Sequence, residues 1–395
     1  MRKIGANYII TGKGEVLKNS YIELDDDGTI LDIVDTKGDL QEISGLEFYN
    51  GILVPGFVNT HTHIELSFLK NKLQQKKDLP FFIKEIRNLK LKTSPSEIQE
   101  AIKQADEEMF REGIVAAGDI ANTTDSLRVK QNSKIDYITF VETYSLDKYK
   151  AYTVFEKAEN TLKAFREAGL KSFIVPHAPY SVSEKLFELI TQKAYDENAI
   201  LSIHNQETES ENEMFISKTG DLLVALSSFG VDVTQWNATG YRSLPSVLVQ
   251  MPQCSKLLLV HNTFSEQEDI DKTLKYTKYA NWVLCPNANT FIEDKLPNIL
   301  LLIENKLAIC IGTDSLASNM QLSIIEELKA IQENFPEIPF ADLIQWATLN
   351  GAQALDIHSK FGSFEKGKKP GVNLIENFDF DNFQLKPESQ VNRLV

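Results

Sequence analysis

The sequence predicts an α/β protein, namely a (β/α)8 TIM barrel with a small β-sandwich module formed from both chain termini. Two observations predict the barrel: eight short apolar runs recur between residues 56 and 360, and segments with helical periodicity separate them. Strands that are buried on both faces appear as continuous apolar runs, as a parallel sheet covered by helices requires. The third observation is that both ends of the chain contain short strand-like segments broken by turns, which predicts the module.

The amino-terminal segment predicts short strands in "ANYIIT", "SYIELDDDGTILDIV" and "LEFYNGILV". Asp27-Gly28 lies between two apolar segments, which is a strong hairpin signal. The tail from residue 361, "FGSFEKGKKPGVNLIENFD", returns to the same pattern of strands and turns. We therefore expect one module from residues 1–55 and 361–395, and a barrel domain from residues 56–360.

The barrel strands are predicted from eight runs, which in chain order are "GFVNTHTH", "IVAAGDI", "IDYITFVET", "SFIVPHA", "ILSIHNQ", "KLLLVHN", "NWVLCPN" and "LAICIGTDS". Between them, "SPSEIQEAIKQADEEMFREG" and "TVFEKAENTLKAFREAG" show helical periodicity with start and stop signals. The segment 218–250 is longer than a plain connection and is a candidate wall of the pocket. In such barrels the functional site lies at the carboxyl ends of the strands.

Composition narrows the classes of partner. The formal net charge of -15 argues against surfaces that bind nucleic-acid phosphates or anionic lipid. No apolar segment approaches the roughly 18 residues of a membrane span, and the amino terminus has no apolar stretch typical of a signal peptide. Three widely spaced cysteines fit reduced thiols. We expect a cytoplasmic protein that acts on a small molecule, with no nucleic-acid or membrane partner.

Five of the six histidines lie at the ends of predicted strands. His61 and His63 are one residue apart, so they point to the same side of their strand. A single histidine at a strand end is more often a hydrogen-bonded structural residue, but five that converge favour a common site. The polar residues at the ends of the later runs are His177, His204, His261 and Asp314.

Neutral imidazole and carboxylate groups are ligands suited to Zn²⁺ or another borderline first-row metal, whereas Ca²⁺ and Mg²⁺ require more oxygen ligands. Three histidines and one aspartate leave a coordination position for water, as catalytic zinc requires. The strand ends therefore predict a catalytic metal site.

At this point the chain resembles the amidohydrolase superfamily, and specifically its deaminase branch, which includes S-adenosylhomocysteine, methylthioadenosine, guanine and aminodeoxyfutalosine deaminases. The resemblance rests on "VPGFVNTHTH", "PHAPYSVS", "IHNQETESE", "VHNT", "CPNAN" and "GTDSLASN", and covers essentially the whole chain. It implies that one divalent metal, with Zn²⁺ as the first choice, is held by His61, His63, His204 and Asp314. Binuclear relatives place a carboxylated lysine where this chain has His177, so we expect one metal and not two.

The resemblance also implies catalytic roles. Glu207, three residues after His204, would carry a proton from water to a ring nitrogen. Asp314 would accept the other proton of the water, and His261 would orient the attacking oxygen or stabilise the tetrahedral centre. His177 would contact the substrate, with a supporting role beside the metal ligands as the alternative.

Two further residues are candidates for substrate binding. Glu65 points into the mouth of the barrel with His63 if the strand alternation continues, where it is either a substrate anchor or a helix-capping carboxylate. Arg242 lies in the long insertion and either contacts a substrate tail or lies on the surface. Neither residue identifies the substrate. A homo-oligomer is expected from the resemblance alone.

The sequence therefore predicts a metal-dependent hydrolytic deaminase of an aminated purine nucleoside or related heterocycle. One alternative keeps the metal site but hydrolyses a cyclic amide or a chlorinated heterocycle. Another is a non-catalytic binding barrel, against which the complete set of polar residues argues. The product distinguishes the three hypotheses: ammonia indicates the deaminase, a ring-opened product or halide indicates the alternative hydrolase, and a binding barrel forms no product.

Overall fold

The computed structural model describes residues 1–234 and 236–395. Strands from both ends of the chain form one six-stranded sheet, in the order β14-β13-β4-β1-β2-β3. The predicted hairpin at Asp27-Gly28 is confirmed, because β2 and β3 pair antiparallel on either side of it and Gly28 adopts a φ of 84°. The bounds of the strands are β1 Arg2–Ile10, β2 Val16–Leu24, β3 Ile30–Val34, β4 Leu46–Pro55, β13 Val372–Glu376 and β14 Gln390–Arg393.

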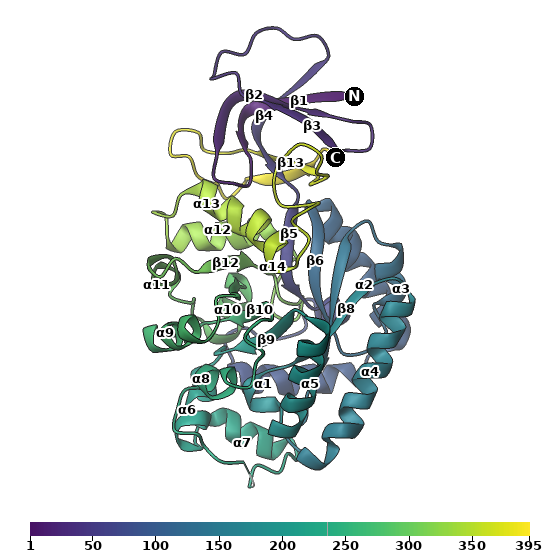
Figure 1. The fold of residues 1–395 in the computed structure, drawn as a ribbon, viewed down its shortest axis with the longest axis vertical. Coiled ribbons are helices and arrows are strands. Elements are labelled where there is room, and N and C mark those ends of the chain that lie inside the picture. The colour runs from purple at the N-terminus through teal and green to yellow at the C-terminus, as the bar shows by residue number, and fades with distance from the viewer. Residues whose placement is uncertain (235) are drawn as a thin grey trace.

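This terminal sheet differs from the predicted sandwich. Within the described ranges, β13 pairs directly with β4, with Val372 opposite Pro55, so the carboxyl-terminal strands extend the amino-terminal sheet instead of forming a second one. The sheet has its own apolar cluster, and Phe364 from the tail packs there with Ile4 and Leu53. In Figure 1 the sheet lies at one end of the molecule, where the purple and yellow parts of the chain meet.

The eight predicted runs all form strands, arranged as two four-stranded parallel sheets with the orders β5-β6-β7-β8 and β12-β11-β10-β9. Every residue of β5, β6, β9 and β10 is buried, which explains why their sequences appear as continuous apolar runs. The bounds are β5 Phe57–Thr62, β6 Ile114–Ala121, β7 Asp136–Thr143, β8 Lys171–Pro176, β9 Leu201–Asn205, β10 Leu257–His261, β11 Ala280–Leu284 and β12 Ala308–Ile311.

The two sheets contact each other at both pairs of outer strands. At one edge the His204 amide donates to the carbonyl of His177 at 2.9 Å. At the other edge Thr62 and Asp314 form a parallel bridge, and the Asp314 amide donates to the carbonyl of His61 at 3.1 Å. The sheets are therefore consistent with a TIM-barrel arrangement.

Helices surround these sheets, and no helix in the described ranges is both long and apolar enough to cross a membrane. The predicted start of α2 is confirmed, because Ser94 and Glu97 form a capping box there. The helix bounds are η1 Ile64–Leu69, α1 Leu79–Lys90, α2 Pro95–Arg111, α3 Leu127–Asn132, η2 Lys148–Lys150, α4 Ala151–Glu167, η3 Pro179–Ser181, α5 Glu184–Glu197, α6 Glu209–Ser217, α7 Asp221–Ser228, α8 Ser243–Leu248, α9 Gln267–Tyr276, α10 Pro286–Glu293, α11 Ile299–Glu304, α12 Ile324–Asn334, α13 Phe340–Gln345, η4 Trp346–Asn350 and α14 Gly351–Ala354.

The carboxyl ends of the strands lie away from the terminal sheet, because β5 starts at Phe57, directly after β4 ends at Pro55. Figure 1 shows α1, α6, α7 and α8 at the end of the molecule opposite the terminal sheet. The long insertion 218–250 contains α7 and α8. Its Trp236 ring packs edge-on against Phe215, with the ring centroids 5.2 Å apart.

A buried ion pair supports the chain directly after His63. The Lys130 ammonium lies 2.5 Å from the carboxylate of Asp119, and both side chains are 0% exposed. Asp119 also accepts a hydrogen bond from the Ile64 amide at 2.8 Å. The pair therefore fixes η1 against β6 and so holds the loop that carries His63.

Replacing Lys130 with Met is expected to destabilise the protein by about 3–5 kcal/mol, because the carboxylate of Asp119 is left buried without a counter-charge. The free energy of unfolding in denaturant measures this loss. Lys103→Met is the control, since Lys103 and Glu107 form an exposed pair 3.9 Å apart and such pairs contribute about 0.3–0.5 kcal/mol. Equal stability of the two variants would contradict a role for the buried pair.

Candidate metal centre and active site

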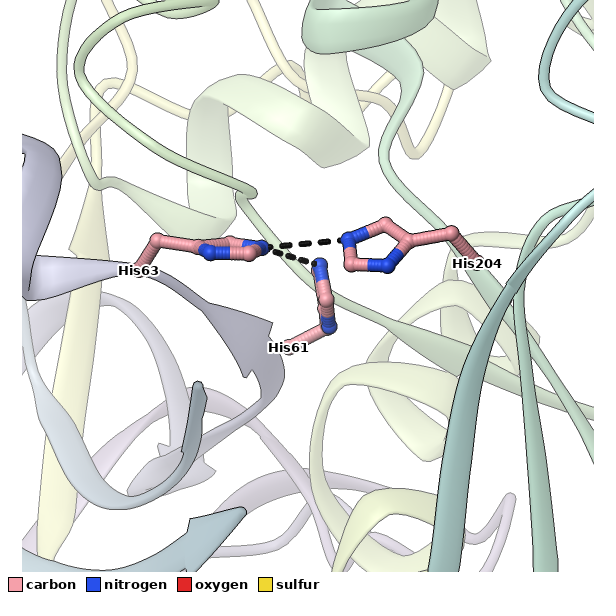
Figure 2. A group of neighbouring side chains, drawn as sticks. All are labelled: His61, His63 and His204. Carbon is pink, nitrogen blue, oxygen red and sulfur yellow. Dashed lines mark hydrogen bonds between the residues drawn. The ribbon is translucent and has the colours of Figure 1, made fainter. Parts of the chain in front are cut away.

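Three histidines bring one ring nitrogen each to a single point. The Nε2 atom of His63 lies 3.1 Å from Nε2 of His61 and 3.2 Å from Nε2 of His204. All three residues are buried. Figure 2 shows these nitrogen atoms turned toward one another, with His61 and His63 from the end of β5 and His204 from β9. The predicted convergence of histidines from β5 and β9 is therefore present.

Asp314 adds a carboxylate to this group. Its Oδ1 atom lies 3.4 Å from Nε2 of His63 and 3.7 Å from Nε2 of His61. Ser318 donates a hydrogen bond to the other carboxylate oxygen. Next to Asp314, Gly312 allows a close approach of β12 to β5, since a Cβ there would lie 2.8 Å from the carbonyl oxygen of His61.

The histidines are in the chemical form that a metal requires. Burial lowers the pKa values of His61, His63 and His204 to about 4, so the rings are neutral near pH 7. His204 Nδ1 lies 2.8 Å from the carbonyl of His177, a pure acceptor. Nδ1 therefore carries the proton, and the lone pair on Nε2 faces the cluster, as in zinc sites supported by backbone carbonyls.

Asp314 is ionised in the same surroundings. Burial alone would raise its pKa, but the interaction with His61 and the nearby His63 and His261 rings lower it below its ordinary value. Three neutral nitrogens and one carboxylate oxygen are the donor set that Zn²⁺ accepts. The residues present therefore fit one divalent cation.

Glu207 and His261 lie beside this donor set. Nε2 of His261 is 3.6 Å from a carboxylate oxygen of Glu207, and both residues are buried. Burial, and then the charge of Asp314, raise the pKa of Glu207 well above its ordinary value. A carboxyl group with a raised pKa is a stronger base than an ordinary carboxylate, which suits general acid and base chemistry.

The orientation of His261 follows from its neighbour on α10. The Asn289 amide nitrogen lies 3.3 Å from Nδ1 of His261 and 2.6 Å from the hydroxyl of Thr263. Because the amide nitrogen donates, Nδ1 accepts and the proton of the neutral ring is on Nε2. His261 therefore presents an N–H group to the side on which Glu207 lies.

Backbone strain is present at the same strand ends. His261 has a φ of 75°, Asn262 of 58°, Asp314 of 55° and Gln206 of 47°. Residues other than glycine adopt this left-handed region at a cost of about 1–3 kcal/mol each, and they do so mainly at functional sites. The surrounding packing forces these side chains into positions that relaxed strand ends would not give.

Glu65 does not lie where the alternation argument placed it. The strand ends at Thr62 and Glu65 is in the 3-10 helix η1, so the two-residue period stops before it. Its carboxylate accepts hydrogen bonds from the amides of Asn122 and Thr123 and from the Ser126 hydroxyl, each at 3.1 Å. These bonds hold the loop between β6 and α3, which favours a structural role for Glu65 over a substrate anchor, although neither η1 nor α3 has a side-chain cap.

The two other residues proposed for substrate binding, Arg242 and His177, lie in different surroundings. Arg242 donates from Nε to Asp269 at 2.8 Å and forms an ion pair with Glu266 at 3.2 Å, so its charge is satisfied within the protein. This pairing within the protein favours a structural role for Arg242 over contact with a substrate tail. His177 lies with its ring centroid 4.9 Å from that of His204, which places it beside the metal ligands.

The chain contains 395 residues, and a model described as "Amidohydrolase family" matches residues 52–392. The chain belongs to this family. An adenosine deaminase from Helicobacter pylori is 27% identical to the amidohydrolase over 388 residues, covering 94% of this chain and 91% of the relative.

Solved structures agree with this fold. The aminofutalosine deaminase of Helicobacter pylori in complex with methylthio-coformycin has a TM-score of 0.80 and 24% identity, covering 96% of this chain and 93% of the other. An adenosine deaminase from Xanthomonas campestris with bound zinc has a TM-score of 0.74 and 20% identity, covering 95% and 84%. The predicted amidohydrolase resemblance is confirmed.

Enzymes of this family use a divalent metal, and the amidohydrolase is a hydrolase that acts on carbon–nitrogen bonds. Metal-dependent hydrolytic deamination, the chemistry predicted from the sequence, is confirmed as its reaction class. The convergence of the candidate metal ligands could be predicted from their strand ends. Ser318 and Asn289 were not, because they come from a loop and a helix and no sequence period marks them.

Proposed function

We propose that this amidohydrolase deaminates an aminated purine nucleoside and holds one Zn²⁺ ion on His61, His63, His204 and Asp314. The observation that carries the proposal is the convergence of three Nε2 atoms and one carboxylate oxygen beside the Glu207 and His261 pair. A bound Zn²⁺ ion would supply Lewis-acid activation of a water molecule. Side chains of the protein carry out the remaining steps.

Glu207 is proposed to move the proton. Its raised pKa allows the carboxylate to take a proton from the attacking water and to deliver it to a ring nitrogen of the substrate. Protonation of that nitrogen makes the amine-bearing carbon electrophilic. The leaving amine must take the second proton of the water to depart as ammonia.

His261 and Asp314 are proposed to act on the attacking oxygen. The Nε2–H group of His261 would stabilise negative charge that develops on the attacking oxygen. Burial lowers the pKa of His261 well below its ordinary value, so the ring donates a hydrogen bond as a neutral group. Asp314 is ionised and can accept the second proton of the water.

The purine nucleoside class is supported by the relatives named adenosine deaminase and aminofutalosine deaminase. His177 is proposed as a substrate contact. Its Nδ1 atom is 2.8 Å from the hydroxyl of Ser181, which fixes the ring and leaves the opposite edge to a ligand. Glu65 and Arg242 are not included among the contacts.

We also infer that the two four-stranded sheets form one (β/α)8 barrel over residues 56–360, with residues 1–55 and 361–395 as the attached module. The backbone contacts between β8 and β9 and between β5 and β12 support this organisation. One metal per chain is supported by Lys171, which begins β8 at the end remote from His177. A cytoplasmic location and a homo-oligomer stay predictions.

The test is ammonia release by zinc-supplemented protein with adenosine, S-adenosylhomocysteine, methylthioadenosine, aminodeoxyfutalosine, guanine and cytosine, with zinc determined on the same sample. We expect turnover of at least one nucleoside at about one zinc per chain. Ring opening of a cyclic amide, or halide release from a chlorinated heterocycle, would instead favour the alternative hydrolase reactions. Zinc-loaded protein that releases no ammonia from the whole panel would contradict the proposal.

A further inference from the structure

Glu142, the last residue but one of β7, has a buried carboxylate that is only half satisfied. One oxygen accepts a hydrogen bond from the Asn122 amide nitrogen at 2.8 Å. The other, Oε1, has no hydrogen-bond partner in the described part of the chain, although the side chain is only 4% exposed. A buried polar atom without a partner is costly, so this oxygen requires an explanation.

The unpartnered oxygen faces the candidate active site. Oε1 lies 3.4 Å from Nδ1 of His204, but that nitrogen donates its only proton to the carbonyl of His177 at 2.8 Å. Potential ligand atoms of Glu142, His177 and His204 all lie within 4.8 Å of one another. The oxygen is therefore an acceptor close to His177, the residue that we propose as a substrate contact.

The position of Glu142 is fixed by a chain of hydrogen bonds. Glu65 accepts the amides of Asn122 and Thr123, each at 3.1 Å. The Asn122 side chain in turn holds Glu142. This framework is independent of the metal ligands, and it keeps the free oxygen in one place before any ligand binds.

We propose that Oε1 of Glu142 accepts a hydrogen bond from a sugar hydroxyl of the nucleoside substrate, next to the atom that His177 contacts. The inference rests on the proposed function. A carboxylate oxygen requires a donor, and the exocyclic amine of the base is committed to the metal side of the pocket. The donors that remain on an adenosine-type nucleoside are the hydroxyl groups of the sugar.

The same three residues could be read as a second metal site. His204 cannot serve it, because Nε2 faces the first site and the Nδ1 proton is bonded to the carbonyl of His177. Glu142 and His177 alone offer two ligands, fewer than the three or four protein ligands of zinc sites. The geometry therefore favours a neutral donor over a cation.

The test compares wild type and Glu142→Gln on the best nucleoside of the panel and on its 2′-deoxy and 3′-deoxy counterparts. For the hydroxylated substrate, we expect Glu142→Gln to lower kcat/KM about 10- to 100-fold, mainly through KM. On one of the two deoxy substrates, wild type is expected to show the same loss of kcat/KM. On that substrate, Glu142→Gln should cause no further loss. If the glutamine variant folds poorly, Glu142→Asp replaces it in the test. Aspartate withdraws the carboxylate, so we expect an intermediate loss of kcat/KM.

Asp136→Asn is the matched control, because Asp136 is an exposed carboxylate at the opposite end of the same strand. We expect it to leave all three substrates unaffected. The inference is overturned by an equal loss on every substrate, by no loss, or by a second equivalent of zinc that disappears in Glu142→Gln. If wild type deaminates no nucleoside at all, the proposed function itself fails. If wild type is active but one of the three contradicting outcomes is observed, only the role of Glu142 is wrong.

Discussion

Replacement of Glu207 with Gln is expected to lower kcat by about 10²–10⁴-fold while one zinc per chain stays bound. Gln has nearly the same size and still forms hydrogen bonds, but it cannot take a proton from water. Burial and the charge of Asp314 raise the pKa of Glu207, which suits the proton transfer that the variant lacks. Steady-state kinetics with metal analysis measure both parts of the prediction.

Glu209→Gln is the control for this variant, because Glu209 is an exposed carboxylate at the start of α6. It should retain full activity. If Glu207→Gln keeps more than about a tenth of wild-type turnover, Glu207 is not the proton carrier. If it loses zinc together with activity, its role is structural.

Replacement of His63 with Ala is expected to lower the affinity for zinc by more than about 100-fold, since loss even of a residue that supports a ligand costs 10- to 100-fold. His63 is central, because its Nε2 atom contacts those of His61 and His204 at 3.1 and 3.2 Å. Activity at stoichiometric zinc should fall to background. Competition with a chromophoric chelator measures the affinity.

His358→Ala is the matched control, because it is the one histidine outside the predicted strand ends and it is exposed. That variant should bind zinc as wild type does. A His63→Ala protein that still binds one equivalent tightly would show that the ligands are assigned incorrectly.

Much of the barrel could be predicted from the sequence, because burial on both faces leaves a continuous apolar run wherever a central strand forms. The terminal sheet was harder to predict. Whether β13 extends β4 or faces it in a second layer depends on pairing between segments at opposite ends of the chain. The local pattern of strands and turns contains no information about that choice.

The site was predictable where strand ends alone decide position, as for His61, His204 and Asp314. Prediction failed for Glu65, because η1 interrupts the strand period directly after His63. Glu142 had a usable signal, since it is the last residue but one of the run "IDYITFVET", as His177 is of the next run. Its role became apparent only from the hydrogen bonds that leave one oxygen free.

The pairing of β13 with β4 also constrains how the protein folds during synthesis. Until the segment that forms β13 has left the ribosome, one edge of β4 has no strand partner, and an unpaired edge is a site for aggregation. The contact between β5 and β12 imposes a similar delay, because Asp314 reaches His61 only after most of the barrel has been made. Long-range pairings of this kind slow folding, so the metal site is completed late and the terminal sheet later still.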